Sequence, residues 1–162
     1  MAETWRTRGY RWMFNWYPAY RGTGARVTYI AGDWSEMRIR VSLSWRTRNY
    51  VGTIFGGSMY AAIDPMYMFM LIQILGPEYI VWDKAATIRF RRPGREPLFA
   101  TFRISPEDVA GIRAAVAETG RTEKEFSLDL ASGSGEVHAS FTKLVSIRRR
   151  DSQAPSTTAA AP

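Results

Sequence analysis

The sequence predicts an α+β domain in which an antiparallel sheet wraps around one long central helix. Apolar and polar residues alternate through six segments, the pattern of strands that bury one face. After the second of these segments, residues 57–75 are almost continuously apolar and end at Gly76-Pro77, a helix stop. A sheet wrapped around a helix leaves the far side of that helix open. A second copy of the chain is the simplest cover, so we expect a homo-oligomer, a dimer or a tetramer.

The six expected strands follow from period-two patterning. Residues 27–31 and 37–45 form a hairpin, 79–91 and 98–104 are joined through Pro93-Gly94, and 126–130 and 137–147 flank a glycine-rich turn. A short helix is expected between Ser105, an N-cap residue followed by proline, and Gly120. Pro65 should bend the central helix, because it removes one helical hydrogen bond.

The two ends of the chain differ from the middle. Residues 1–24 are expected to form an aromatic-rich helix and loop, 25–150 the main domain, and 151–162 a disordered tail rich in Ser, Thr, Ala and Pro. We expect the aromatic stripe of the first helix to pack on the domain or on a neighbouring subunit. The alternative is a surface anchor for membrane or acyl chains. The stripe consists of Trp12, Met13, Trp16, Tyr17 and Tyr20.

Composition narrows the function classes. The chain has no cysteine, which excludes disulfides and thiolate metal sites and favours a reducing cytoplasm. Its single histidine, His138, excludes His-rich metal sites and is expected to be structural. We therefore expect no metal and no redox cofactor. No signal peptide is expected, and Asp64, Pro65 and Gln73 interrupt the apolar central segment, which favours a buried helix over a membrane span.

The chain is basic, with a net charge of +7 and 19 arginines against three lysines. Such a balance suits phosphorylated ligands, an anionic membrane or nucleic acid, and also serves solubility alone. Nucleic-acid binding would rest on charge only and is not expected.

One stretch carries the functional prediction: Asn49, a loop, the pair Gly56-Gly57 at the start of the central helix, and Asp64 within it. The first N–H groups of a helix lack helical partners and can bind an oxygen that develops negative charge. Asp64 lies seven residues beyond Gly57, two turns and about 10.5 Å away. One helix cannot bring both groups to the same carbonyl, so the spacing predicts a site shared between two subunits.

These residues resemble the hotdog-fold acyl-CoA thioesterases of the phenylacetic-acid-pathway type. The signature of those enzymes is Asn, five residues, His-Gly-Gly, six residues, then Asp or Glu, and Asn49, Phe55-Gly56-Gly57 and Asp64 reproduce each spacing. One departure is that Phe55 replaces the usual His. The motifs Gly52–Tyr60 and Val81–Ala86 are similar to the hotdog family named domain of unknown function 4442, and the likeness spans residues 25–147.

The resemblance implies hydrolysis of an acyl thioester carried by coenzyme A or an acyl carrier protein, with coenzyme A present only as part of the substrate. Asp64 would be the general base, Gly57 the oxyanion donor, and Asn49 would orient the water or the carbonyl. From the residues alone, Asn49 is as readily part of an Asx turn. Burial amid apolar neighbours is expected to favour Asp64 as a base.

The remaining substrate-binding candidates fall into three groups. Aromatic and small residues near the helix start would line the acyl pocket, and a lysine on the following strand would pair with a buried carboxylate or form an interface ion pair. Arginines at the strand end would bind the nucleotide phosphates. The candidates are Phe55, Gly56, Ser58, Tyr60, Lys84, Arg89, Arg92 and Arg95.

Two other functions fit the same fold. Phe55 in place of His favours a non-catalytic acyl-CoA-binding module. An enoyl-thioester hydratase would use an Asp-His pair, and no histidine lies near Asp64 in the sequence.

Overall fold

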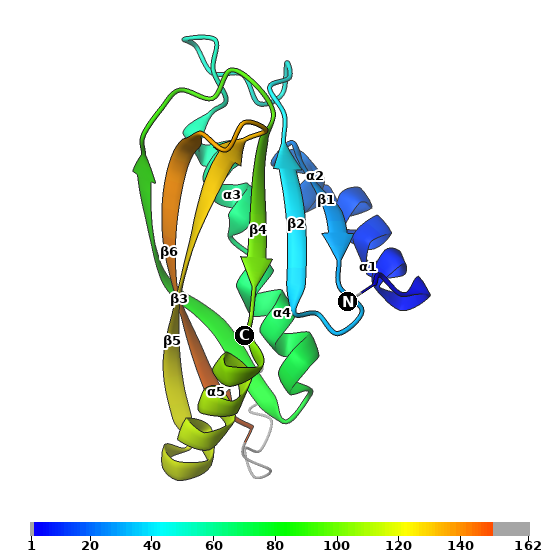
Figure 1. The fold of residues 1–162 in the computed structure, drawn as a ribbon, viewed down its shortest axis with the longest axis vertical. Helices are drawn as coiled ribbons and strands as arrows, with labels where there is room; N and C mark the ends of the chain where they lie inside the picture. The colour runs from blue at the N-terminus through cyan, green and yellow to red at the C-terminus, as the bar shows by residue number, and fades with distance from the viewer. Residues whose placement is uncertain (1, 151–162) are drawn as a thin grey trace, which may run out of the picture.

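The computed structural model describes residues 2–150, so the tail predicted to be disordered lies outside the described residues. One six-stranded antiparallel sheet curves around the central helices (Figure 1). The strand order across the sheet is β1-β2-β4-β5-β6-β3, which leaves β1 and β3 at the edges. The strands are β1 (Ala25–Ile30), β2 (Glu36–Val41), β3 (Tyr79–Phe90), β4 (Leu98–Arg103), β5 (Arg121–Ser132) and β6 (Val137–Arg149).

The central segment is two helices rather than the one bent helix predicted. Its first half ends at Asp64 and its second half begins after Pro65, which cannot donate the N–H that a continuous helix needs there. The break sets Asp64 at the C-terminus of the first half. The helices are α1 (Trp5–Trp16), α2 (Pro18–Gly22), α3 (Gly56–Ile63), α4 (Met66–Leu75) and α5 (Pro106–Thr119).

The main hydrophobic core lies between α3–α4 and the sheet. Met59, Ile63, Met66 and Met70 are buried there with inward-facing strand residues such as Phe102. By length and hydropathy the segment Gly56–Leu75 could cross a membrane, but half of it is buried in the fold and it is broken in the middle. Its packing is that of a core helix. The predicted hotdog arrangement, a sheet around a central helical segment that follows the second strand, is confirmed.

Two strands differ in detail from the prediction. Strand β2 ends at Val41, short of the predicted Trp45, because the chain turns at residues 42–48. The buried Thr47 hydroxyl stabilises that turn by donating to the Ser42 carbonyl at 2.6 Å. Strand β3 contains a bulge between Asp83 and Ala85, which interrupts the alternation of faces.

The bulge corrects the expected position of Lys84. Simple alternation places Lys84 in line with Ala86 and Ile88, on the inner face. In the structure Lys84 is exposed and pairs with Glu123 of β5, whereas Asp83 points inward. The extra residue of the bulge therefore exchanges the two side chains between faces.

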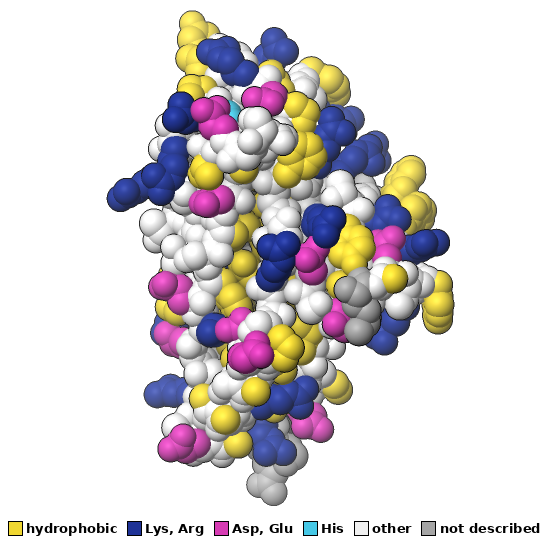
Figure 2. All heavy atoms as spheres, in the orientation of Figure 1, with side chains coloured by type: hydrophobic (Ala, Val, Ile, Leu, Met, Phe, Trp, Pro, Cys, Tyr) yellow, Lys and Arg dark blue, Asp and Glu magenta, His cyan; other side chains and the backbone are white. Residues whose placement is uncertain are grey.

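The N-terminal helices pack on β1 and on the central helices mainly through residues outside the predicted stripe. Thr7 and Phe14 of α1 and Tyr20 of α2 are buried, and Phe14 meets Phe69 of α4 edge-on at 4.7 Å. Of the predicted stripe only Tyr20 is buried, and Trp12 is 65% exposed. Figure 2 shows hydrophobic side chains projecting among basic ones at the right-hand edge, over α1.

Candidate functional site

Asp64 lies where the central helical segment breaks. Its Oδ1 accepts a hydrogen bond from Lys143 Nζ at 2.8 Å. The side chain is 45% exposed, so it is less buried than the sequence predicted and remains open to a ligand. Helix α3 and strand β6 thus jointly hold this carboxylate.

Lys143 stands in the middle of β6 with its side chain only 2% exposed. Its Nζ also lies 3.1 Å from Oδ2 of Asp83, so one ammonium bridges two carboxylates. Burial by itself lowers the pKa of Lys143, but the hydrogen bonds and charges of Asp64 and Asp83 outweigh it and leave the pKa above its ordinary value. The lysine is therefore cationic at neutral pH.

Asp83 is the less exposed counterpart of Asp64, with 20% of its side chain exposed. Burial raises the pKa of Asp83 by more than the nearby Lys143 charge lowers it. Within residues 2–150 its Oδ1 is buried without a hydrogen-bond partner. Asp83 therefore compensates the charge of Lys143 on its less exposed side, and Asp64 is the carboxylate that faces solvent.

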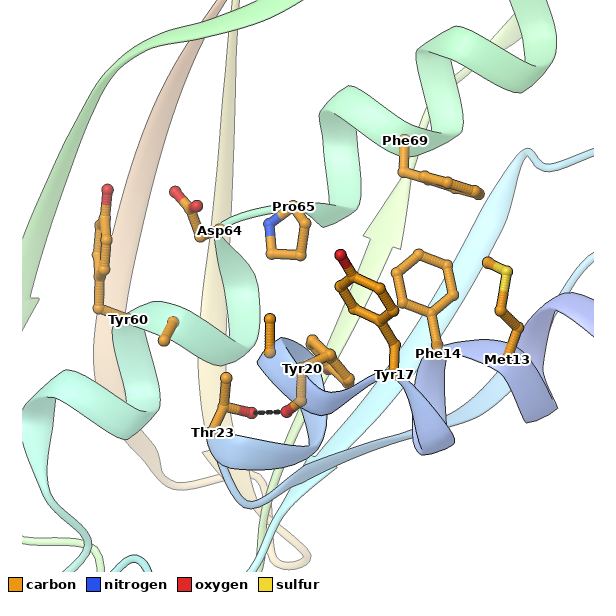
Figure 3. Close-up of a pocket in the computed structure, with 11 residues that line it drawn as sticks. Met13, Phe14, Tyr17, Tyr20, Thr23, Tyr60, Asp64, Pro65 and Phe69 are labelled. Carbon is orange, nitrogen blue, oxygen red and sulfur yellow. Dashed lines mark hydrogen bonds between the residues drawn. The ribbon is translucent and has the colours of Figure 1, made fainter.

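Tyr60, one turn before Asp64, forms a cluster with Asp64, Asp83 and Lys143. Its ring lies over Lys143 Nζ at 5.9 Å, and its side chain stands beside Asp64 (Figure 3). Burial raises the pKa of Tyr60, and the negative charge of Asp64 raises it further. The phenol therefore stays protonated at neutral pH and can act as a hydrogen-bond donor.

An apolar pocket of about 510 Å³ opens beside Asp64. Its walls come from α1 and α2 on one side and from α3, Pro65 and α4 on the other (Figure 3). Asp64 and Tyr60 lie at one end, and Phe14 and Phe69 line the opposite part. A pocket with one polar end suits a ligand that has a reactive polar head and an apolar tail.

A second hollow, about 440 Å³, lies at the other end of α3. It brings together Asn49, Gly56 and three arginines, Arg91, Arg92 and Arg95. Arg92 also pairs with Glu136 at 3.1 Å. This arrangement combines basic side chains with a helix N-terminus, which suits a phosphorylated ligand. Arg89, expected in the same place, does not line this hollow.

The glycine pair is packed closely by aromatic rings. A Cβ added at Gly56 would lie 2.7 Å from the Phe90 ring, and one at Gly57 would lie 2.3 Å from the Phe55 ring. In the described part of the chain, no side chain caps the N-terminus of α3. A larger residue at either position would therefore require these rings to move, and the first helical N–H groups have no capping side chain.

Several predicted site residues have structural partners. The Asn49 amide donates to Thr53 Oγ1 and accepts from the Thr53 N–H, both at 2.9 Å, which is a local turn. Ser58 is buried and Phe55 is exposed at the N-cap of α3. His138, which was expected to be structural and not a site residue, contacts the Pro93 carbonyl through Nδ1 at 3.1 Å. Among residues 2–150, no cluster of three or more His, Asp or Glu side chains could hold a metal ion.

Lys143 is the site residue that the sequence analysis missed. A signal for it was present: Lys143 falls in the inward-facing register of β6 with Phe141, Val145 and Ile147. An ammonium in an apolar register indicates a buried carboxylate partner.

Lys143→Met should destabilise the protein by about 3 kcal/mol, because removing one partner leaves buried charge uncompensated. Lys84→Met, which breaks an exposed pair, should cost less than about 1 kcal/mol. Adding Asp83→Asn to Lys143→Met should recover part of the loss. Urea unfolding at pH 7 measures all four proteins, and equal costs for the two lysine substitutions would contradict the assignment.

Similarity to known proteins identifies the family and the fold of this chain. The sequence profile of the domain of unknown function DUF4442 matches residues 7–146. No curated protein sequence matches the chain.

Solved structures show the same fold at low sequence identity. PA5026 from Pseudomonas aeruginosa has a TM-score of 0.79 at 20% sequence identity, and the match covers 93% of this chain and 100% of that one. PA5026 is described as a protein of unknown function and a probable thioesterase. OLEI01261 from Chlorobaculum tepidum, a protein of unknown function, has a TM-score of 0.72 at 13% sequence identity, and the match covers 90% of this chain and 95% of that one. The thioesterase HI1161 from Haemophilus influenzae has a TM-score of 0.66 at 11% sequence identity, and the match covers 91% of this chain and 93% of that one. With a profile match over most of its length and the hotdog fold of these neighbours, the chain belongs to the DUF4442 family.

Proposed function

We propose that this protein is a cytoplasmic acyl-thioester hydrolase that acts on an acyl group carried by coenzyme A or an acyl carrier protein. The observation that carries the proposal is the Asp64 carboxylate, held by buried Lys143 at the polar end of an apolar pocket. The thioesterase description of a neighbour with the same fold supports it.

Asp64 would act as the general base. It accepts a proton from water as the water oxygen bonds to the thioester carbon, and the carbonyl oxygen becomes an oxyanion. The oxyanion then collapses, the carbon–sulfur bond breaks, and the proton passes from Asp64 to the departing sulfur. Lys143 keeps the carboxylate oriented, and the Tyr60 hydroxyl can hydrogen-bond the reacting oxygens.

The oxyanion donor would be the N–H of the partner subunit's Gly57, because within one chain that group lies about 10.5 Å from Asp64 along α3. Strand β3 could form the dimer interface, because it lies at the edge of the sheet and exposes Trp82 and Phe90. Phe90 packs on Gly56, and Asp83 is linked to Asp64 through Lys143. A two-fold axis crossing β3 midway between Asp83 and Phe90 would therefore bring the partner subunit's Gly57 toward Asp64.

A non-catalytic acyl-CoA-binding protein is the second candidate. One observation favours it: the Phe55 ring packs against Gly57, where the related thioesterases carry an imidazole. A hydratase is less well supported, because His138 contacts the Pro93 carbonyl and does not line the Asp64 pocket.

Asp64→Asn keeps the shape of the side chain but removes the base. We expect the rate of thiol release from an acyl-CoA to fall by about 10² to 10⁴-fold, with the fold retained. Asp129→Asn, an exposed change on β5, is the matched control and should match wild type. An Asp64→Asn protein as active as wild type would make this residue structural and would favour the binding-only candidate.

We expect the nucleotide of the substrate to bind in the hollow that contains Arg91, Arg92 and Arg95. Arg92→Gln and Arg95→Gln should each raise KM for an acyl-CoA about tenfold, since each loses a charged hydrogen bond to phosphate. Neither should change KM for the matching acyl-pantetheine, which lacks the nucleotide, and Arg89→Gln is the control. Equal losses on both substrates would give these arginines a structural role.

A further inference from the structure

We infer that the N-terminal helices α1 and α2 form the wall that selects the acyl group, and that the pocket takes an extended apolar acyl chain. This rests on the proposed function and adds the substrate class. The pocket beside Asp64 is bounded by α1–α2 and by the break between α3 and α4 (Figure 3). The carboxylate at its end marks where the thioester carbon would lie.

The wall is anchored to the central helix rather than loosely placed. The buried Tyr20 hydroxyl of α2 donates to the Ala62 carbonyl in the last turn of α3, at 3.2 Å. Phe14 packs edge-on against Tyr20 at 5.7 Å and against Phe69 at 4.7 Å. These contacts tie α2 to the turn of α3 that presents Asp64 and tie α1 to the start of α4, so the pocket has a defined shape.

The lining decides what kind of acyl group fits. Away from Asp64 and Tyr60, the lining side chains are apolar or aromatic, apart from Thr23, whose hydroxyl donates to the Tyr20 carbonyl at 2.7 Å. A charged end group would lose its hydration there without gaining a charged partner, since the Tyr17 hydroxyl is the polar group that Figure 3 shows directed into this part of the pocket. A volume of about 510 Å³ also exceeds what an acetyl group would fill. The fitting ligand is an uncharged acyl chain long enough to reach Phe14 and Phe69.

The pocket can be filled from either wall without touching Asp64. Ala61 lines it from α3 and Ala19 lines it from α2. Ala61→Phe and Ala19→Phe should each shorten the space for the chain, and two variants from opposite walls guard against local misfolding. Ala114→Phe, an exposed change on α5, is the matched control.

The experiment measures kcat/KM for butanoyl-CoA and dodecanoyl-CoA, and the binding of a dansyl-labelled dodecanoic acid. Each methylene group buried contributes roughly fourfold to affinity, so excluding about four of them should lower the dodecanoyl-to-butanoyl ratio by roughly 250-fold. Probe binding should weaken in the same variants, and Ala114→Phe should change neither quantity.

The two readouts separate this inference from the proposed function. An unchanged ratio and unchanged probe binding in both folded pocket variants would overturn the inference and leave hydrolysis intact. If wild type hydrolyses no ester, the hydrolase proposal fails, and probe binding alone then decides. Weaker probe binding in the pocket variants would still support an acyl-binding pocket at this position, and probe binding equal to that of wild type would contradict it.

Discussion

A buried ammonium between two carboxylates is the interaction on which the site depends. Without Asp64 and Asp83, the charge of Lys143 would be buried inside the sheet uncompensated, and the lysine holds both carboxylates within 3.1 Å of its Nζ. The cluster links β6, the edge strand β3 and the break in the central helix. The fold and the candidate chemistry are therefore joined at one cation, and Asp64 is the more exposed of its two carboxylates.

The break in the central helix gives this cluster its setting. Pro65 ends α3 at Asp64, and the opening between α3, α4 and the N-terminal helices becomes an apolar pocket. At the opposite end of α3 a second hollow gathers arginines around Gly56. One short helix thus separates a site suited to an acyl chain from a site suited to phosphate. In the proposed dimer, the two ends belong to complementary halves of each active site.

Much of the fold could be predicted from local patterns. Period-two alternation located the six strands, and the Ser105 cap and Gly120 located α5, because these signals reside in neighbouring residues. The bulge at Asp83–Ala85 could not be predicted, since it depends on pairing with β6, and it reversed the expected place of Lys84. The partner of Asp64 was missed for a similar reason: Lys143 is 79 residues away in sequence and meets it only through the sheet. The exposed stripe of α1 shows that amphipathic spacing identifies a face but not the surface that covers it.

Subunit mixing tests the central claim, a site in which Asp64 and Gly57 come from different copies. Gly57→Pro removes the proposed oxyanion N–H in the first helical turn, and Phe55→Ala in the same chain clears the ring that lies 2.3 Å from a Cβ at this position. Asp64→Asn in the other variant removes the base. Each variant alone should be inactive. When the two are unfolded and refolded together, hybrid dimers would contain one intact site, and random pairing predicts about a quarter of wild-type thioesterase activity. A refolded mixture as inactive as its two parents would contradict the shared site.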